Sequence, residues 1–401
     1  MAFMRFDDRF VFGLVEEDKL VKALKRNPYY QRIDSGAGLF VRIGGKEYLN
    51  LASNNYLALA NHPEIIAEMK HALDVYGASM CGTPVACGSV DLYQQATREV
   101  SLFLGLEDAI LYPSCFQANV AAIGALVKPD DVVYVDRNAH SSIIEGIRAT
   151  GCKIKPFKHN DVDYLRELVR RPEKFQNRFV ATESVFSTEG SIAPFDLIYD
   201  LAMEHDLIPI VDDSHGIGVI GQTGRGILEE KQIKNYAGIY TASTGKALGI
   251  SGGFVCSSYH IIEFLRYSSP GLLYSTALPP ALIAGTIKAL EIVSREGREM
   301  VQRLSLNKDY LYERLQGSGF RLCTSEAFIC SLLAGSNEST FRIYLALFDE
   351  GVLTTPFIYP SVAKKQGVIR MIPRIDLNRE QMDHVITSLL SIREKHPELF
   401  D

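Results

Sequence analysis

The sequence predicts an α/β protein in which helices flank a mostly parallel sheet and a smaller α+β domain follows. Three observations support this fold class. Short, often β-branched apolar runs alternate with amphipathic helical patterns over the first three quarters of the chain, which is typical of βαβ units around a buried parallel sheet. After about residue 290 the pattern changes to long helices with few strands between them. The chain has 401 residues, more than one core usually organises, so two domains are expected.

The composition excludes several classes of protein. A net charge of −6 without a basic stripe argues against a nucleic-acid surface. No apolar run reaches the length of a membrane span, and the N-terminus mixes acids and bases too early for a signal peptide. The seven cysteines are scattered without a CxxC pair, so we expect no disulfide framework, no metal site and a cytoplasmic location.

The elements of the first three quarters follow in order. Residues 39–51 are strand-like, and the segment 1–60 is expected to pack beside the smaller domain. Behind a capping Asn61, apolar residues at helical spacing predict a helix over 61–77. The large domain is assigned to 61–290. Its strand candidates are the apolar runs at 109–112, 132–135, 178–183 and 207–213.

The last quarter, 291–401, is predicted to form the small α+β domain. Two helices are expected first, over 283–297 and 300–316, the second of them stopped by Gly317. A final helix begins at Asn378, and the glutamine three residues later resembles a capping box. Strand candidates between these helices are 320–322, 330–333 and 368–372.

The stretch "TASTGKALGISGGF", residues 241–254, places one lysine among glycines and hydroxyls. A nucleotide-binding P-loop needs a glycine six residues before the lysine and Ser or Thr directly after it. Tyr240 and Ala247 occupy those positions, so the hydroxyl that would bind magnesium is absent. On this stretch alone, a surface turn with an incidental lysine would remain the favoured interpretation.

Polar residues elsewhere give Lys246 possible companions. Asp212 ends an apolar strand, and His215 comes three residues later. His140 follows another strand in "VDRNAHSS". Ligands of parallel sheets bind beyond the carboxyl ends of the strands, so these residues are expected near one crevice. A strand, turn and helix in "LYPSCFQANV" would direct backbone N–H groups at an anion. These groups belong to Ser114, Cys115 and Phe116.

This set matches the needs of pyridoxal 5′-phosphate (PLP). Its aldehyde needs a lysine, its pyridine nitrogen a carboxylate, its ring face a stacked aromatic group and its phosphate a helix N-terminus. Each feature alone is weak evidence for a PLP site, because a strand-end aspartate is often a helix cap and a lone histidine is usually structural. Asp212 and Lys246 are 34 residues apart, which leaves room for a helix and a strand between them.

At these residues the sequence resembles the α-oxoamine synthases, a family of PLP enzymes with the aspartate aminotransferase-like fold, called fold type I. The resemblance covers nearly the whole chain, from near Asn27 to the final helix. Its most specific motifs are "SNNYLALANHP", "FKHND", "VDDSHGIGVIGQTGRG", "STGKALGISGG" and "PGLLYSTALPP".

The resemblance implies a role for each of these positions. Lys246 would form the Schiff base, Asp212 would pair with the pyridine nitrogen and His215 would bind the ring hydroxyl. His140 would stack on the ring, which completes the catalytic set. The implied phosphate ligands are Ser114, Cys115, Phe116 and Ser243, together with Ser275 and Thr276 from a neighbouring subunit.

The same resemblance places further residues around the substrate. Glu183 and Ser187 are counted among the neighbours of the cofactor, and Asn54 and Ser187 would lie near the substrate. Arg370 matches the arginine that grips the amino-acid carboxylate, a task suited to a planar, bidentate guanidinium. Arg374, four residues further on, is left as an alternative for that task.

The implied reaction is a decarboxylating condensation of an α-amino acid with an acyl thioester to give an α-amino ketone, CO2 and a free thiol. The enzyme would be a homodimer with shared active sites. Neither the amino acid (glycine, alanine or serine) nor the carrier of the acyl group (coenzyme A or an acyl carrier protein) is specified. Two alternatives stay open: an aminotransferase of the same fold, and a catalytically inactive scaffold subunit.

The sequence departs from the family pattern mainly near the substrate entrance. Tyr93 stands where histidine is usual, Val85 where a basic residue is usual and Thr97 where glutamate is usual. Cys115 and Ser184 each replace a glycine, and Cys115 is interpreted as a small buried residue in preference to a reactive thiol. The departures leave the cofactor set intact and put the identity of the substrates in doubt.

Two residues within the family motifs have no assigned chemistry. His159 in "FKHND" is interpreted as a structural turn residue, and Tyr56 could equally be a core aromatic.

Overall fold

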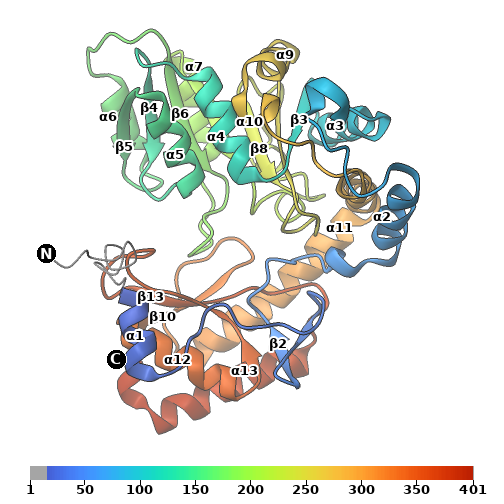
Figure 1. Ribbon diagram of the computed structural model, residues 1–401. Helices are drawn as coiled ribbons and strands as arrows, with labels where there is room; N and C mark the ends of the chain where they lie inside the picture. Colours follow the sequence, from blue (N-terminus) through green and yellow to red (C-terminus); the bar gives the residue numbers. More distant parts are fainter. Residues whose placement is uncertain (1–15, 401) are drawn as a thin grey trace, which may run out of the picture.

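The computed structural model describes residues 16–400, and side chains from residue 19 onward. Figure 1 shows an upper α/β half and a smaller lower half, with the long helix α11 running from one into the other. Within the described residues, no helix is both long and apolar enough to cross a membrane. Residues 1–15 of the predicted N-terminal segment lie outside the described part of the chain.

A seven-stranded sheet forms the centre of the upper half, in the order β3-β9-β8-β7-β6-β4-β5. Only β9 runs antiparallel to its neighbours, which confirms the predicted mostly parallel sheet. All four predicted strand runs are strands of this sheet. The strands are β3 Asp108–Tyr112, β4 Val132–Asp136, β5 Lys153–Phe157, β6 Arg178–Glu183, β7 Ile208–Asp212, β8 Ile239–Ser243 and β9 Gly253–Ser257.

Side chains of the central strands alternate between two buried layers. In β4, Val132 and Tyr134 belong to one hydrophobic core, and Val133 and Val135 belong to the other. Because helices cover both faces, the central strands β4, β6 and β7 are almost entirely buried and largely apolar. The second core includes α4 Cys115–Leu126, α5 Ser141–Thr150, α9 Tyr259–Ser268 and α10 Pro270–Leu273. The first core includes α2 Pro63–Tyr76, α3 Asp91–Leu104, α6 Val162–Val169, α7 Phe195–Glu204 and α8 Ile227–Glu230.

The lower half has its own core, built on two small sheets with the orders β10-β13-β12 and β1-β2-β11. The final helix begins with the predicted capping box, in which Asn378 and Gln381 exchange hydrogen bonds. The elements are α1 Glu16–Leu24, β1 Phe40–Ile43, β2 Lys46–Asn50, β10 Cys330–Gly335, α12 Asn337–Asp349, β11 Val352–Leu353, β12 Thr355–Phe357, β13 Gly367–Met371 and α13 Arg379–Lys395.

The two helices predicted over 283–297 and 300–316 are a single helix, α11 Pro280–Gly317, so that prediction was wrong. Gly297, the last residue of the first predicted helix, lies inside α11, and a Cβ there would clash with the carbonyl oxygen of Thr223. The glycine therefore serves close packing and does not end the helix. The helix joins the two halves, since Leu304 belongs to the upper core and Leu311 to the lower one. The predicted domain division at residue 290 stays a prediction.

Two smaller expectations also need correction. Asn61 does not cap α2; it lies in the short 3-10 helix Leu59–Asn61, and His62 is the N-cap residue, followed by Pro63 in the first turn. The proline supplies the helical φ without a side-chain cap. Residues 320–322 do not form a strand and contribute only an isolated bridge from Leu322 to Leu332.

Candidate functional site

A cavity of about 380 Å³ opens where the carboxyl ends of β4, β6, β7 and β8 meet the start of α4. Parallel strands bring residues from distant parts of the sequence to this edge of a sheet. Eight of the predicted site residues line the cavity: Ser114, Cys115, Phe116, His140, Glu183, Asp212, Ser243 and Lys246.

Lys246 enters the cavity from the turn that follows β8. Burial lowers the pKa of its ammonium group, while the carboxylate of Asp212 works against that shift. Its amine is therefore more readily available in the neutral, nucleophilic form than that of a solvated lysine.

Asp212 ends β7 and is held by two donors. Asn119 Nδ2 donates to Oδ2 at 2.6 Å, and the backbone N–H of Ser214 donates to Oδ1 at 3.0 Å. Glu183 lies beside it in the adjacent strand β6. Burial and the negative charge of Asp212 raise the pKa of Glu183 well above its usual range. The raised pKa favours the neutral acid form of Glu183, as expected for a buried carboxyl group beside another carboxyl group.

A fully buried asparagine connects Asp212 with His140. Nδ2 of Asn119 is also 2.9 Å from Ser142 Oγ, which lies 2.7 Å from His140 Nδ1. Its Oδ1 accepts from Thr241 Oγ1 at 2.7 Å. We did not predict a role for Asn119 from the sequence. The sequence contained one indication of such a role: Asn119 lies one turn into the helix that begins at the expected anion site.

His140 is the N-cap residue of α5, and its Nδ1 accepts from the backbone N–H of Ser142. Burial lowers the pKa of its imidazole. Its ring meets that of Phe116 edge to face, with centroids 6.3 Å apart. The neutral, oriented ring at the cavity wall provides a surface for a planar ligand.

The start of α4 forms the anion-binding end of the cavity. Ser114 caps the helix by accepting from the backbone N–H of Gln117, which leaves the N–H groups of Cys115 and Phe116 at the helix N-terminus. Gly253 makes room for this turn, since a Cβ there would lie 2.4 Å from Cys115 N.

Cys115 is a buried, neutral thiol. Burial, followed by the negative charge of Asp212, raises its pKa well above the usual range. Its sulfur lies 3.2 Å from Ser214 Oγ and 3.8 Å from Asp212 Oδ1. These contacts favour the interpretation of Cys115 as a small buried residue, because a reactive cysteine needs an accessible thiolate.

His215 does not line this cavity and forms a hydrogen bond with Tyr56. The tyrosine hydroxyl is 2.9 Å from His215 Nδ1, and both side chains are buried. Burial, followed by the positive charges of Lys246 and Arg370, lowers the pKa of His215 well below its usual range. Tyr56 is thus both a core aromatic and a partner of a predicted site residue.

Besides His215, five predicted residues do not line the cavity of Lys246. Asn54 and Arg370 each have a buried polar atom, Oδ1 and Nε, without a partner among the described residues. Ser275 and Thr276 follow α10, and Thr276 is exposed. Ser187 lines a second cavity, and its carbonyl accepts from Arg370 Nη1 at 2.8 Å.

Arg374 is committed to a structural role. Its guanidinium makes two hydrogen bonds to the carboxylate of Asp376, at 2.8 and 2.7 Å, and a third to the carbonyl oxygen of Gly38. The side chain is 1% exposed. Of the two arginines considered for carboxylate binding, only Arg370 keeps an unpartnered donor.

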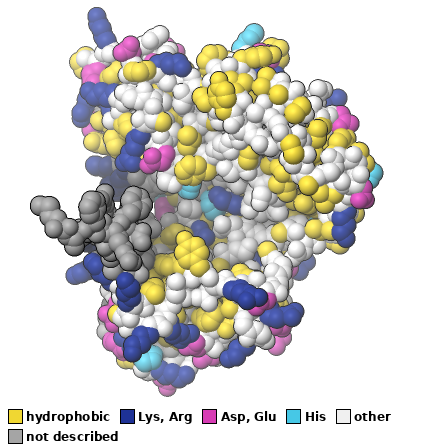
Figure 2. All heavy atoms as spheres, in the orientation of Figure 1, with side chains coloured by type: hydrophobic (Ala, Val, Ile, Leu, Met, Phe, Trp, Pro, Cys, Tyr) yellow, Lys and Arg dark blue, Asp and Glu magenta, His cyan; other side chains and the backbone are white. Residues whose placement is uncertain are grey.

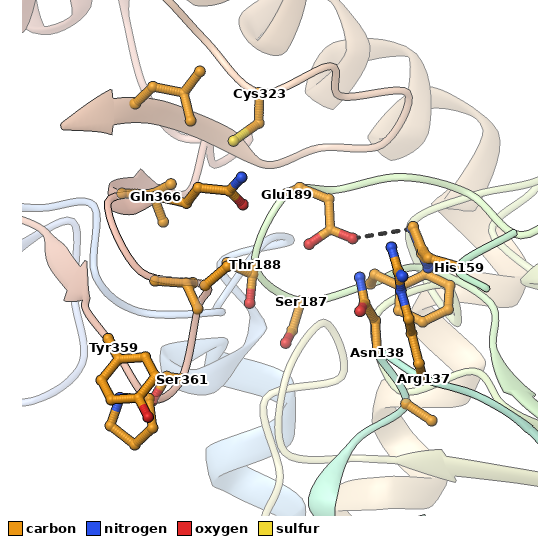
Figure 3. Close-up of a pocket in the computed structure, with 17 residues that line it drawn as sticks. Arg137, Asn138, His159, Ser187, Thr188, Glu189, Cys323, Tyr359, Ser361 and Gln366 are labelled. Carbon is orange, nitrogen blue, oxygen red and sulfur yellow. Dashed lines mark ion pairs between the residues drawn. The ribbon is translucent and has the colours of Figure 1, made fainter. Parts of the chain in front are cut away.

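Figure 3 shows the second cavity, of about 840 Å³, whose lining shares the segment 137–142 with that of the first. Residues 137–139 line the larger cavity, and His140 and Ser142 line the smaller one. Polar side chains labelled around the larger cavity in Figure 3 are Arg137, Asn138, His159, Ser187, Thr188, Glu189, Tyr359, Ser361 and Gln366.

His159 ties three segments together at the wall of the larger cavity. Its Nδ1 is 3.1 Å from Asp136 Oδ1, and its Nε2 is 3.3 Å from Glu189 Oε1. Burial lowers the pKa of His159, but hydrogen bonds with these two carboxylates outweigh burial and raise the pKa to about 9. The contacts support the structural interpretation of this residue.

A stability prediction follows for His159→Gln. Because the pKa rises from 6.5 to about 9 on folding, protonation of His159 stabilises the fold below pH 6.5, and this contribution is lost as the pH rises through 9. We expect the variant to lose about 2 kcal/mol of unfolding free energy at pH 6, after allowance for solvent screening. The loss should be much smaller at pH 9.5.

Urea unfolding of the wild type and the variant at both pH values measures this difference. His260→Gln, which alters an exposed histidine, is the matched control and should behave alike at the two pH values. An equal loss of stability at pH 6 and pH 9.5 in His159→Gln would show that the ion pairs do not carry the effect.

Comparisons with known proteins agree with one another. The family model "Aminotransferase class I and II" matches residues 46–389. The chain is 36% identical to the 2-amino-3-ketobutyrate coenzyme A ligase of Escherichia coli K12, over 81% of this chain and 82% of that protein. It is 30% identical to the 8-amino-7-oxononanoate synthase of Bacillus pumilus, over 93% of this chain and 95% of that protein.

A solved structure gives the same picture. It is that of SPT, serine palmitoyltransferase, with a PLP internal aldimine. It superposes with a TM-score of 0.91 at 25% sequence identity and covers 97% of this chain and 98% of the other.

Proposed function

The chain belongs to the aminotransferase class I and II family and, within it, to the α-oxoamine synthases, and from this we propose that it is a PLP-dependent acyltransferase. Its reaction is the condensation of an α-amino acid with an acyl thioester, with loss of CO2 and of the free thiol, to give an α-amino ketone. One observation carries the proposal: a lysine, a strand-end carboxylate, a histidine and a helix N-terminus line one cavity at the edge of a fold-type-I sheet.

The residues of the cavity fit PLP. Lys246 would bind the aldehyde carbon, Asp212 the pyridine nitrogen and His140 the face of the ring. The start of α4, with Ser243, would hold the phosphate, since free N–H groups and a helix dipole favour an anion. When bound, PLP supplies an electron sink for the negative charge that develops at the amino acid's α-carbon.

We assign proton movement at the α-carbon to Lys246. Its lowered pKa makes Nζ available as a base, and its place in the cavity keeps it next to the cofactor it binds. Hydrogen bonds from Asn119 and Ser214 orient the carboxylate of Asp212, and its charge would hold the proton on the pyridine nitrogen.

We assign the amino-acid carboxylate to Arg370. Its guanidinium is buried, packs 4.9 Å from the ring of Phe357 and still has an unpartnered Nε donor. A buried cation without an anionic partner is costly, and a bound carboxylate relieves that cost. The Oδ1 of Asn54 also has no partner among the described residues, and it would accept a hydrogen bond from the substrate.

The larger cavity is the place with room for the acyl thioester. It lies next to the cofactor cavity along 137–142, and Ser187 forms part of its wall (Figure 3). Hydroxyl and amide side chains such as Thr188, Ser361 and Gln366 suit the amide-containing arm of a thioester carrier better than an alkyl chain.

We also propose that the enzyme is a cytoplasmic homodimer with shared active sites. Ser275 and Thr276, the implied phosphate ligands, lie outside the cavity of their own chain. Near them are exposed hydrophobic side chains: Val85 is 59% exposed, Tyr267 70% and Tyr274 85%. Figure 2 shows hydrophobic side chains gathered over the upper face that carries α3, α9 and α10. Apolar patches of this kind mark protein interfaces.

The reaction is tested by supplying the PLP-loaded protein with glycine, alanine or serine and acyl thioesters of graded length, carried by coenzyme A or by an acyl carrier protein. We expect CO2 and free thiol in equal amounts, and only when an amino acid and a thioester are both present. Transfer of the amino group to a keto acid without thiol release would identify an aminotransferase. A protein that takes up no PLP would be a scaffold subunit.

A further inference from the structure

The surroundings of Tyr56 and His215 determine which of the two side chains donates the hydrogen bond between them. The two rings meet edge to face, with centroids 6.2 Å apart and planes at 85°. Tyr56 is 1% exposed and His215 5%. Neither side chain can replace its partner with bulk water.

The histidine of this pair is neutral. Burial lowers its pKa, and the positive charges of Lys246 and Arg370 act in the same direction. A neutral imidazole has one nitrogen that donates and one that accepts, and the partner of one nitrogen determines the state of the other.

The tyrosine of the pair keeps its proton. Burial raises the pKa of its phenol, although the positive charge of Arg370 opposes the shift. Among the described residues, Nδ1 of His215 is the only hydrogen-bond partner of the Tyr56 hydroxyl.

If Nδ1 carried the imidazole proton, the phenol proton would have no acceptor. A buried donor without a partner costs roughly 1–3 kcal/mol. The arrangement in which Tyr56 donates to Nδ1 avoids that cost, and it leaves the imidazole proton on Nε2.

We infer that Tyr56 is a positioning residue that holds His215 in the Nε2–H tautomer, so that this nitrogen donates to the ring oxygen of PLP. The inference rests on the proposed cofactor site, and it adds a residue that acts on the cofactor only through His215. The one hydrogen bond that His215 makes with a described residue uses Nδ1, which leaves Nε2 to donate to the ligand.

Tyr56→Phe removes the hydroxyl and keeps the ring. Tyr93→Phe is the matched control, because Tyr93 is a buried tyrosine of the same core whose hydroxyl bonds only to the backbone of Leu111. The first measurement is nitrogen-15 NMR of histidine-labelled protein without PLP, with the His215 signals assigned through His215→Gln.

The wild type and Tyr93→Phe should show His215 protonated at Nε2, and Tyr56→Phe should lose that preference. In the second measurement, PLP binding followed by its visible absorbance, Tyr56→Phe should bind about tenfold more weakly, and Tyr93→Phe should stay close to the wild type.

A wild-type His215 protonated at Nδ1, or a Tyr56→Phe spectrum identical to that of Tyr93→Phe, would overturn the inference. Because the NMR measurement needs no cofactor, it gives this answer even if the protein does not bind PLP. Failure of PLP uptake by the wild type would instead contradict the proposed function, so the two failures are distinguishable.

Discussion

Replacing Lys246 with alanine will leave a folded protein that neither retains PLP covalently nor turns over substrate. Among the residues that the structure describes, Lys246 is the only lysine that lines the cavity, so none of the others is placed to replace it as the cofactor's anchor or as the base at the α-carbon. Turnover should fall below detection. Mass spectrometry after borohydride reduction should find the mass of PLP on the wild type and not on the variant, and CO2 release measures activity.

Lys231→Ala is the control for this experiment. Lys231 lies outside the cavity, 3.8 Å from Asp196, so its loss should change neither the cofactor mass nor the rate. Undiminished product formation by Lys246→Ala would contradict the mechanism proposed for Lys246, and covalent PLP on another lysine of that variant would contradict the assigned anchor.

Asp212→Asn should retain the fold and lower kcat roughly 1,000-fold. The substitution keeps the shape of the side chain and removes the charge that would hold a proton on the pyridine nitrogen. Without that proton the cofactor is a poor electron sink, and removal of the α-proton becomes slow. Steady-state CO2 release gives kcat, and exchange of the α-proton of the amino acid with deuterated water isolates the affected step.

A carboxylate elsewhere in the same sheet provides the comparison. Asp108 begins β3 outside the cavity and pairs with Arg266 at 2.7 Å, so Asp108→Asn should leave kcat within about twofold of the wild type, since it touches no reacting group. If Asp212→Asn were equally mild, the pyridine nitrogen would not depend on Asp212, and the orientation of the cofactor in this cavity would have to be revised.

The neighbouring aspartate shows why structure is needed to separate structural from chemical carboxylates. Asp213 follows Asp212 directly but accepts hydrogen bonds from the Tyr240 hydroxyl and from the backbone N–H of Ile227. Burial raises its pKa to about 7 despite these bonds. Asp213 therefore holds loops together, while Asp212 faces the cavity. In the sequence, its position at the end of a strand favoured Asp212 as the partner of the pyridine nitrogen. The contacts of Asp213 explain why that residue does not take this role.

Much of the fold was predictable because its signals are local. Apolar runs of four to seven residues identified the strands at 109–112, 132–135, 178–183 and 207–213. Since carboxyl ends of parallel strands meet at one edge, His140, Asp212 and Lys246 could be expected together. The prediction was wrong at the boundary between the two helices expected over 283–297 and 300–316, because Gly297 packs against Thr223 inside one continuous helix.

By itself, the sequence determined the fold class and the family and predicted a cofactor-binding set around Lys246, because these depend on residue types in order along the chain. Only the tertiary structure decided which residues share a cavity. It placed Ser187 in the larger cavity, committed Arg374 to Asp376, and revealed Asn119 and Tyr56 as partners of Asp212 and His215. Asn119 and Asp212 are 93 residues apart in the chain, and Tyr56 and His215 are 159 apart. Hydrogen bonds across such separations form only when the folded sheet and helices bring the side chains together.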